Sequence, residues 1–370
     1  MRVLLTDRQL VNGYTLGLAA GLRADGVEVL IGAPARTGVN SVTAIYPRSG
    51  VPGQRIGKAC DGIIGTSRFQ RLLAITRPDL LHIQWPTIQD AAYAIEAKRL
   101  CRLPLVYTAH NPVKRINDYG RGATIQSRLI RLADLVLVHG PSMHELVADA
   151  HPWAASKTYP VELGNYEHMI HRYPRTQARA QLNIPADVPL FAFVGQLQPR
   201  KGVDLLLEAF VEHRRQGGTG HLLLAGVAPV PDYEQKLREM AHRFGPTVHW
   251  LVSTSFVPHK TIDLAISAAT QVTLPFQDAS QSASLILAMT HGRCVVSSDV
   301  GEVSRTLGDR GILIRPGDRQ SLLEALALGE HDQALCDELG DRARRYTLTE
   351  LSWTAIGRET HQLYRTIRDS

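Results

Sequence analysis

The feature that most constrains the fold is an alternation of short aliphatic runs with longer amphipathic segments, which occurs twice along the chain. In the first half these runs stand at residues 3–6, 27–31, 80–84, 105–108 and 135–139. In the second half they stand at residues 190–194, 221–225, 248–252, 271–274, 293–297 and 311–314. Continuous apolar runs between helical segments are typical of parallel strands covered on both faces. The sequence therefore predicts two doubly wound α/β domains in tandem.

A polar segment over residues 166–188 separates the two halves. It contains Pro174 and Pro185 and shows no clear period, so we expect an interdomain linker there. The expected domains are then Rossmann-like units over residues 1–165 and 189–350. A final helix over residues 351–370 is expected to return to the first domain. With 370 residues, each half is long enough to bury a core of its own.

Several classes of protein are disfavoured by simple patterns. No apolar run approaches the about 20 residues of a membrane-spanning helix. Asp7 and Arg8 interrupt the first apolar stretch, which argues against a signal peptide. We therefore expect a cytoplasmic protein, with peripheral contact at the inner face of the membrane left open. The four cysteines are far apart and form no Cys-x-x-Cys, so reduced and mostly buried thiols are expected rather than a zinc or redox motif.

The excess of positive charge is confined to the first half. Residues 1–170 carry 19 Lys and Arg against 13 Asp and Glu, whereas the remainder carries 22 of each. Arg121, Arg128 and Arg131 can share one face of a helix. This pattern favours an anionic acceptor or an anionic membrane surface, and a merely solvated helix face is the alternative. No binding of nucleic acid is predicted.

A glycine-rich and cationic loop follows the first strand of the second half. The strand ends before Gly195, the cations Arg200 and Lys201 follow, and a helix begins after Gly202. Glycines let a phosphate approach the backbone, and a helix N-terminus offers free N–H groups with positive potential. The arrangement suits a diphosphate leaving group. A surface Arg-Lys pair beside a structural glycine is the alternative.

A second polar loop lies between the strand that ends near Leu274 and the helix that begins near Ser284. Its residues have small or polar side chains, and we predict that the following ones line a phosphate site: Asp278, Ser280, Gln281, Ser282, Ala283 and Ser284. Hydroxyl groups at a helix N-terminus can cap the helix, and they can also hold a pyrophosphate. Both roles are compatible.

Together, four motifs resemble those of GT-B glycosyltransferases of family 4. They are Val194-Gly195 followed by Lys201-Gly202, the strand-end motif with His110, the glycine loop with Gly13, and residues 287–301. The resemblance implies two Rossmann-like domains that face a central cleft and close on their substrates. It implies a nucleoside-diphosphate sugar on the second domain, an acceptor on the first, and transfer with retention. It also implies that no metal or other cofactor is needed.

The resemblance also implies roles for individual residues. Lys201 would contact the donor diphosphate, and His110 would lie near the donor sugar, unless it is a core histidine bonded to backbone. Gly13, Gly195 and Gln196 would belong to the donor loops. Contacts to the nucleotide base are expected from Gly226, Ser253, Ser255 and Phe256. The alternative is that these loop residues only pack against their neighbours. Contacts to the acceptor are expected from Asn12, Trp85, Asn111, Lys114 and Arg115. For Trp85 the alternative is a buried tryptophan in the core.

Two departures from the family pattern affect the donor loop. Gln196 stands where the family usually has arginine, although Arg200 can supply the charge. The family's two glutamates, eight positions apart, correspond to Ala279 and Leu287, and Asp278 is the nearby carboxylate that could contact the donor sugar. The stereochemical outcome is therefore open. An inverting reaction would need a base such as Asp7 or His110.

Two other functions share this architecture. A nucleotide-sugar 2-epimerase would need paired carboxylates near the donor, and residues 275–287 contain few acidic groups. A catalytically degenerate nucleotide-sugar-binding protein would explain the lost glutamates but not the presence of Lys201 and His110. A dehydrogenase is disfavoured because no Gly-x-Gly-x-x-Gly follows the first strand. The predicted acceptor is a polysaccharide or lipid-linked glycan, or a small molecule.

Overall fold

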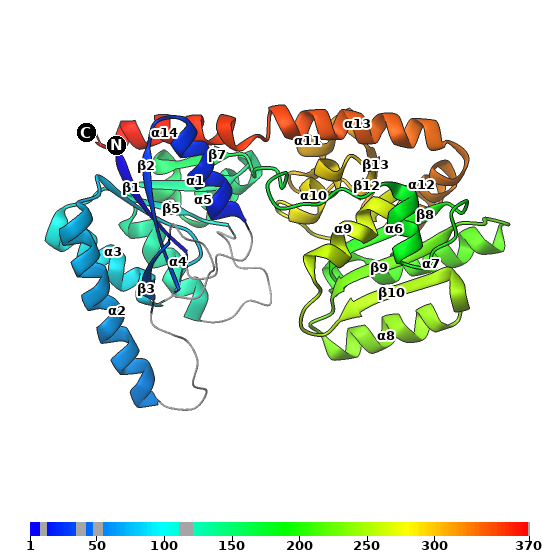
Figure 1. Cartoon of the computed structure of the whole chain (residues 1–370), viewed down its shortest axis with the longest axis horizontal. Helices are drawn as coiled ribbons and strands as arrows, with labels where there is room; N and C mark the ends of the chain where they lie inside the picture. The colour runs from blue at the N-terminus through cyan, green and yellow to red at the C-terminus, as the bar shows by residue number, and fades with distance from the viewer. Residues whose placement is uncertain (8–12, 35–41, 47–54, 87, 111–120, 369–370) are drawn as a thin grey trace. The chain divides into compact units, whose positions relative to one another are not determined.

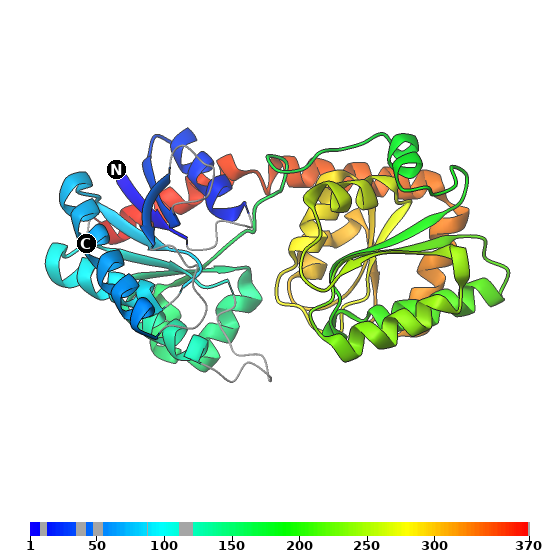
Figure 2. The ribbon, with the colours of Figure 1, turned by 60° about the horizontal axis from the view of Figure 1, so that its bottom comes forward.

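Two parallel β-sheets, each with helices on both faces, make up the fold (Figures 1 and 2). The computed structural model describes residues 1–7, 13–34, 42–46, 55–86, 88–110 and 121–368. One compact unit comprises Met1–Gly164 with Leu351–Ser370, and the other comprises Asn165–Glu350. The predicted fold class of two doubly wound parallel-sheet units is confirmed.

The sheet of the first unit has seven strands, all parallel. In spatial order they are β3 (Val42–Tyr46), β2 (Glu28–Pro34), β1 (Arg2–Thr6), β4 (Leu80–Ile83), β5 (Leu105–Thr108), β6 (Leu135–His139) and β7 (Thr158–Val161). Three helices pack side by side on one face: α2 (Arg55–Thr76), α3 (Ile88–Cys101) and α4 (Arg121–Leu132). The other helices are α1 (Tyr14–Ala24), α5 (Pro141–Ala150) and α14 (Trp353–Arg368). The sequence pattern missed β3 and the edge strand β7, where Pro160 is tolerated because an edge strand leaves one side unpaired.

The last helix, α14, packs along α1 at very short range. A Cβ added to Gly21 would lie 1.8 Å from the carbonyl oxygen of Trp353, and one added to Gly357 would lie 2.2 Å from the carbonyl carbon of Gly21. The two backbones therefore touch, which only glycines permit. The buried residues of α14 recur at helical spacing and include Trp353, Ile356 and Tyr364. This packing makes α14 part of the first unit.

The sheet of the second unit has six parallel strands. In spatial order they are β10 (Val248–Ser253), β9 (His221–Val227), β8 (Leu190–Gln196), β11 (Gln271–Leu274), β12 (Cys294–Ser298) and β13 (Ile312–Ile314). Helix α7 (Val203–Arg215) contacts both α8 (Pro231–His242) and α12 (Arg319–His331). Four other helices contact one another in succession: α6 (Arg175–Gln181), α9 (His259–Ala268), α10 (Ala283–His291) and α13 (Gln333–Thr349). The short helix α11 (Val303–Leu307) completes the unit.

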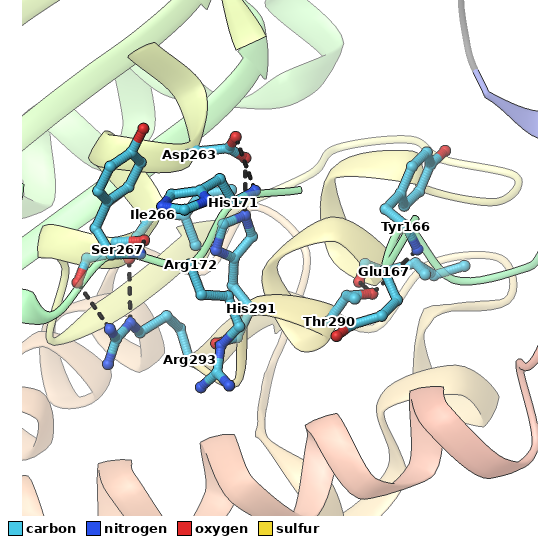
Figure 3. Close-up of polar contacts among 12 residues, drawn as sticks. Tyr166, Glu167, His171, Arg172, Asp263, Ile266, Ser267, Thr290, His291 and Arg293 are labelled. Atoms are coloured by element: carbon cyan, nitrogen blue, oxygen red, sulfur yellow. Dashed lines mark hydrogen bonds and ion pairs between the residues drawn. The ribbon is translucent and has the colours of Figure 1, made fainter. Parts of the chain in front are cut away.

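The segment expected to be a linker, residues 166–188, instead packs onto the second unit. The backbone N–H of His171 donates to Asp263 Oδ2 at 3.1 Å, and Asp263 Oδ1 lies 3.1 Å from His291 Nε2 (Figure 3). Further along, Arg179 in α6 donates to the carbonyl oxygen of Ala268 at 3.0 Å. The polar residues that lacked a period in the sequence are thus paired with α9 and α10.

The cysteines are distant in sequence, but two of them meet in the fold. Cys294 and Cys336 are both buried and hydrogen-bonded as free thiols, whereas Cys101 is exposed. The side chain of Cys60 lies outside the described residues.

Candidate functional site

Each sheet has one place where the strand order changes direction. In the first unit this switch lies between β1 and β4, and in the second it lies between β8 and β11. Loops that leave neighbouring strands in opposite directions open a crevice at the carboxyl ends, where ligands of such sheets bind. The predicted residues fall in the loops at these two switches and at the strands beside them.

In the second unit, the two loops at the switch touch through their backbones. Gly202 has a left-handed conformation, with φ 64°, and an added Cβ would lie 2.0 Å from the carbonyl oxygen of Pro275. The backbone N–H groups of Gln277 and Asp278 both donate to the carbonyl oxygen of Arg200, at 2.8 and 3.3 Å. The loop after β8 and the loop after β11 are therefore bound to each other as one structure.

Lys201 is held at this junction by an aromatic ring. Its Nζ lies 3.7 Å from the ring centroid of Phe276, which is fully buried at the end of β11. A cation over a ring face is attracted by the ring quadrupole. The neighbouring Arg200 donates from Nε to Gln198 Oε1 at 3.0 Å. The predicted pair of cations is thus fixed beside the switch, while Gln196 and Asp278 are exposed.

The start of α10 faces the end of β8. A Cβ added to Gly195 would lie 2.6 Å from Ser284 Oγ, and the φ of 134° at this position favours glycine. Ser282 caps α10, because its Oγ accepts a hydrogen bond from the N–H of Leu285 at 3.2 Å. Gln281 Oε1 accepts from the N–H of Ser282 at 2.9 Å, and its buried Nε2 finds no partner among the described residues. The capping role is shown for Ser282, and the loop retains a buried donor.

The first position of the missing glutamate pair, Ala279, is buried against the loop after β12. An added Cβ on Gly301 would lie 2.0 Å from the carbonyl oxygen of Ala279, and the N–H of Glu302 donates to the carbonyl oxygen of Ser280 at 2.9 Å. Sequence reasoning overlooked Glu302, which is buried and accepts from Arg305 Nε at 2.6 Å. The sequence feature that could have identified Glu302 is its position directly after Gly301, in the loop that follows β12.

The residues predicted to bind a nucleotide base lie at the ends of the next two strands. Gly226 is buried in β9, where an added Cβ would lie 1.7 Å from the carbonyl oxygen of Gly195, so its lack of a side chain serves strand packing. Ser253 Oγ accepts from the N–H groups of Ser255 and Phe256 at 3.3 and 3.4 Å. The Phe256 ring is 65% exposed. Base binding by these residues stays a prediction.

In the first unit, adjacent strands bring three histidines together. His82 lies in β4, His110 directly after β5, and His139 at the end of β6. His139 Nε2 lies 3.0 Å from His110 Nδ1, and His110 Nε2 lies 3.2 Å from Gln84 Oε1. Gln84 Nε2 in turn lies 2.9 Å from His82 Nε2. Within the described residues, these contacts of His110 are made to side chains.

Aromatic rings enclose His110. Trp85 is half-buried and stacks on its imidazole, with 4.0 Å between ring centroids and 5° between planes. Tyr14, the first residue of α1, meets the same imidazole edge-on at 4.8 Å. The tryptophan predicted to contact an acceptor thus presents one face to His110.

These histidines are neutral at physiological pH. Burial lowers the pKa of His82 to about 3 and that of His139 to about 4. Burial, and then repulsion from His139 and His82, holds the pKa of His110 well below its usual value. A neutral imidazole carries one donor and one acceptor. The cluster can therefore orient a hydroxyl group but supplies no positive charge.

The loop after β1 contributes a carboxylate and a glycine. Asp7 is buried and accepts from Thr15 Oγ1 at 2.6 Å. Gly13 begins α1 in a left-handed conformation, with φ 66°, and its carbonyl oxygen accepts from the N–H of Gly17 at 2.8 Å. The Asp7 side chain, considered as a base for an inverting reaction, thus helps to fix the start of α1.

Several predicted residues lie outside the described part of the chain. They are Asn12, Asn111, Lys114, Arg115 and the side chain of Arg121. On the described part of the basic surface, Arg131 and Lys157 lie 5.2 and 5.5 Å from the ring centroid of Trp153.

None of the described helices is long and apolar enough to cross a membrane. Within the same residues, no three His, Cys, Asp or Glu side chains are grouped as a metal site would require.

Two family models match the chain in tandem. The model described as "Glycosyl transferase 4-like domain" covers residues 11–164, and "Glycosyl transferases group 1" covers residues 188–328. The chain is 27% identical to alpha-D-kanosaminyltransferase of Streptomyces kanamyceticus over 184 residues, which is 49% of this chain and 46% of that protein. It is 24% identical to the putative teichuronic acid biosynthesis glycosyltransferase TuaC of Bacillus subtilis, over 78% of this chain and 71% of the relative.

A solved structure with a similar fold matches nearly the full length of the chain. The crystal structure of Anabaena Alr3699/HepE in complex with UDP and glucose has a TM-score of 0.75 at 19% identity, and the match covers 99% of this chain and 100% of that one. The two family models fall on the two units, and the switch-point loops of the second unit lie inside the group 1 match. The chain belongs to the group 1, family 4-like glycosyltransferases of the GT-B fold.

Proposed function

We propose that the protein transfers a sugar from a nucleoside-diphosphate sugar to a hydroxyl group of an acceptor, and that the second unit binds the donor. The observation that carries this proposal is the joined pair of loops at the β8–β11 switch. There the Gly195 backbone, the Lys201 ammonium and the start of α10 surround the same strand ends. A departing diphosphate develops negative charge, which a fixed cation and free N–H groups stabilise.

The family supports this assignment. Both matching family models describe glycosyl transferases. The similarly folded Anabaena protein was solved with UDP and glucose. In this chain, the buried Nε2 of Gln281 is a hydrogen-bond donor that lacks a partner among the described residues. A bound phosphate or sugar oxygen would satisfy it.

The division of chemistry between the units follows from their charges. We infer that Lys201, Arg200 and the α10 N–H groups serve in place of a metal ion. The neutral His110 orients a substrate hydroxyl group in the first unit. The positions of the missing glutamates, Ala279 and Leu287, hold no carboxylate that could form a covalent intermediate. Retention by front-side attack, with a phosphate oxygen taking the acceptor proton, is the outcome we expect.

The experiment incubates the full chain with a panel of nucleoside-diphosphate sugars, with and without a panel of glycan, lipid-linked and small-molecule acceptors. Nucleoside diphosphate and glycosylated acceptor are quantified by mass spectrometry, in magnesium and in EDTA. We expect equal amounts of both products, only with acceptor present, in either buffer. An isomerised donor sugar without acceptor would support the epimerase, and nucleotide binding without any turnover would support a degenerate binding protein. Loss of turnover in EDTA would contradict metal-independence.

A further inference from the structure

A continuous row of buried polar side chains connects the last helix to His110. Tyr364 in α14 places its hydroxyl oxygen 2.5 Å from His82 Nδ1. His82 Nε2 lies 2.9 Å from Gln84 Nε2, and Gln84 Oε1 lies 3.2 Å from His110 Nε2. His139 Nε2, 3.0 Å from His110 Nδ1, completes the row. Residues 82 and 364 are far apart in sequence, and only the return of α14 to the first unit brings them together.

The Gln84 carboxamide gives this row a direction, because its two ends differ chemically. Its Nε2 can only donate, so His82 Nε2 must carry a lone pair. The Thr108 hydroxyl lies 2.7 Å from the same nitrogen and can share this lone pair. His82 is then protonated on Nδ1 and donates to the Tyr364 hydroxyl oxygen. The orientation of the Gln84 amide thus sets the proton position on His82.

The other end of the carboxamide fixes the next ring. Gln84 Oε1 can only accept, so His110 carries its proton on Nε2 and donates to it. His110 Nδ1 then accepts from Nε2–H of His139. A neutral imidazole in water exchanges between two tautomers, whereas this row, with the Gln84 amide in this orientation, favours one at each ring. His110 therefore presents a defined donor, Nε2–H.

The surroundings keep the row rigid. His82, Gln84, Thr108 and Tyr364 are each 0% exposed. A buried polar group that loses its partner costs free energy, so the buried members of the row favour an arrangement that keeps these contacts. The backbone contact of α14 with α1 through Gly21 holds the helix that carries Tyr364.

We propose that Tyr364, His82 and Gln84 are positioning residues that hold His110 in its Nε2–H tautomer, with its ring against Trp85, for a hydrogen bond to a substrate oxygen. This inference rests on the proposed function for its substrate. The bond from His110 to Gln84 is the longest in the row, at 3.2 Å, so it is the one that a substrate oxygen can most readily share or replace. A helix near the C-terminus is thereby coupled to the chemistry of the first unit.

The test reads the tautomer directly, with the full chain labelled with 15N in its histidine rings and without any substrate. The His110 signals are assigned by their loss in His110→Gln. In the wild type we expect one protonated nitrogen, Nε2. In Tyr364→Phe, which removes only the hydroxyl group, we expect a mixture of tautomers and a kcat lower by about tenfold, as the loss of one buried hydrogen bond implies. The donor KM should change little.

The control is Tyr233→Phe, which removes a hydroxyl bonded to Asp204 at 2.9 Å in the second unit. It should leave the His110 tautomer and kcat unchanged. A wild-type His110 protonated on Nδ1, or the same tautomer and kcat in Tyr364→Phe, would overturn the inference even where sugar transfer is observed. The predicted tautomers in a protein that transfers no sugar from any donor would instead overturn the proposed function and leave the hydrogen-bonded row intact.

Discussion

The two units place opposite kinds of polar chemistry at their switch points. The first unit gathers neutral imidazoles between Trp85 and Tyr14, and His110 lies among them. The second gathers the Lys201 cation, close backbone approaches at Gly195 and Gly202, and the start of α10. A neutral hydrogen-bonded cluster can align a hydroxyl group, whereas a cation beside free N–H groups stabilises developing negative charge. The two similar folds are thus suited to different tasks, alignment in the first unit and charge stabilisation in the second.

The buried histidines of the two units also differ in the groups that they contact. In the first unit, the described contacts of His82 and His139 are to neutral side chains. In the second, His291 lies 3.1 Å from Asp263 and His213 lies 2.6 Å from Glu330. The pKa of Glu330 falls to about 2, in spite of burial, because Thr219 and then His213 donate to its carboxylate. Burial lowers the pKa of His291 as well, although the Asp263 carboxylate opposes this shift, so the two units differ in the partners of their histidines.

The largest expected effect is a loss of stability in acid that originates in the first unit. The pKa of His82 in the folded state, about 3, is below its value near 6.5 in an unfolded chain. Below pH 6.5 the unfolded state therefore binds a proton that the folded state does not. The free energy of unfolding then falls by about 1.4 kcal/mol for each pH unit and each such histidine, until the folded pKa is reached.

Urea unfolding between pH 7.5 and pH 5 measures this slope. His82→Gln, which cannot titrate, should reduce the slope by the contribution of one histidine. Equal slopes in wild type and His82→Gln would show that His82 is not held neutral.

The next effect concerns the charge supplied by the second unit. Lys201→Ala should lower turnover by about 100-fold, because it removes the cation that we propose faces the departing diphosphate. The matched control is Lys236→Ala, whose ammonium lies 2.8 Å from Asp204 on the surface of α8 and α7. Steady-state kinetics with a saturating acceptor measures both variants. Similar turnover in the two variants would remove Lys201 from the proposed role.

A smaller effect tests the close approach of the two loops in the second unit. Gly202 and Gly217 both have positive φ, but an alanine Cβ would meet the carbonyl oxygen of Pro275 only at Gly202, and nothing within 4 Å at Gly217. Gly202→Ala should therefore destabilise the protein by about 2 kcal/mol more than Gly217→Ala does. It should also weaken nucleotide binding. Thermal unfolding and calorimetric titration compare the pair, and equal effects would mean that the loops do not touch as described.

Much of this arrangement could be predicted from strand ends alone. The aliphatic runs located β1, β4, β5, β6 and most strands of the second sheet, and the ends of those runs led to His110 and Lys201. This succeeds because parallel strands align their carboxyl ends, so residues just after them gather at one edge. The edge strand β7 escaped because Pro160 interrupts its pattern.

The partners of His110 could not be predicted in this way. His82 lies within β4, where an apolar run makes a histidine look like part of the core. Tyr364 is on a helix whose contact depends on the glycines of α1, and helical spacing shows only that it faces inward. The segment over residues 166–188 was misjudged for a related reason, because polar residues such as Arg179 are paired with backbone of the second unit. Pairing at long sequence separation leaves no local signal.

The most direct test of the central claim is binding of nucleoside diphosphates to the second unit. Thermal unfolding is measured with UDP, GDP, dTDP, ADP and CDP, for the wild type, Lys201→Ala and His110→Gln. A nucleotide at about 100 times its dissociation constant adds about 2.7 kcal/mol of stability. We predict that one nucleotide stabilises the wild type and His110→Gln alike, and that Lys201→Ala loses most of this effect. Absence of a shift with any nucleotide, or an equal shift in Lys201→Ala, would contradict it.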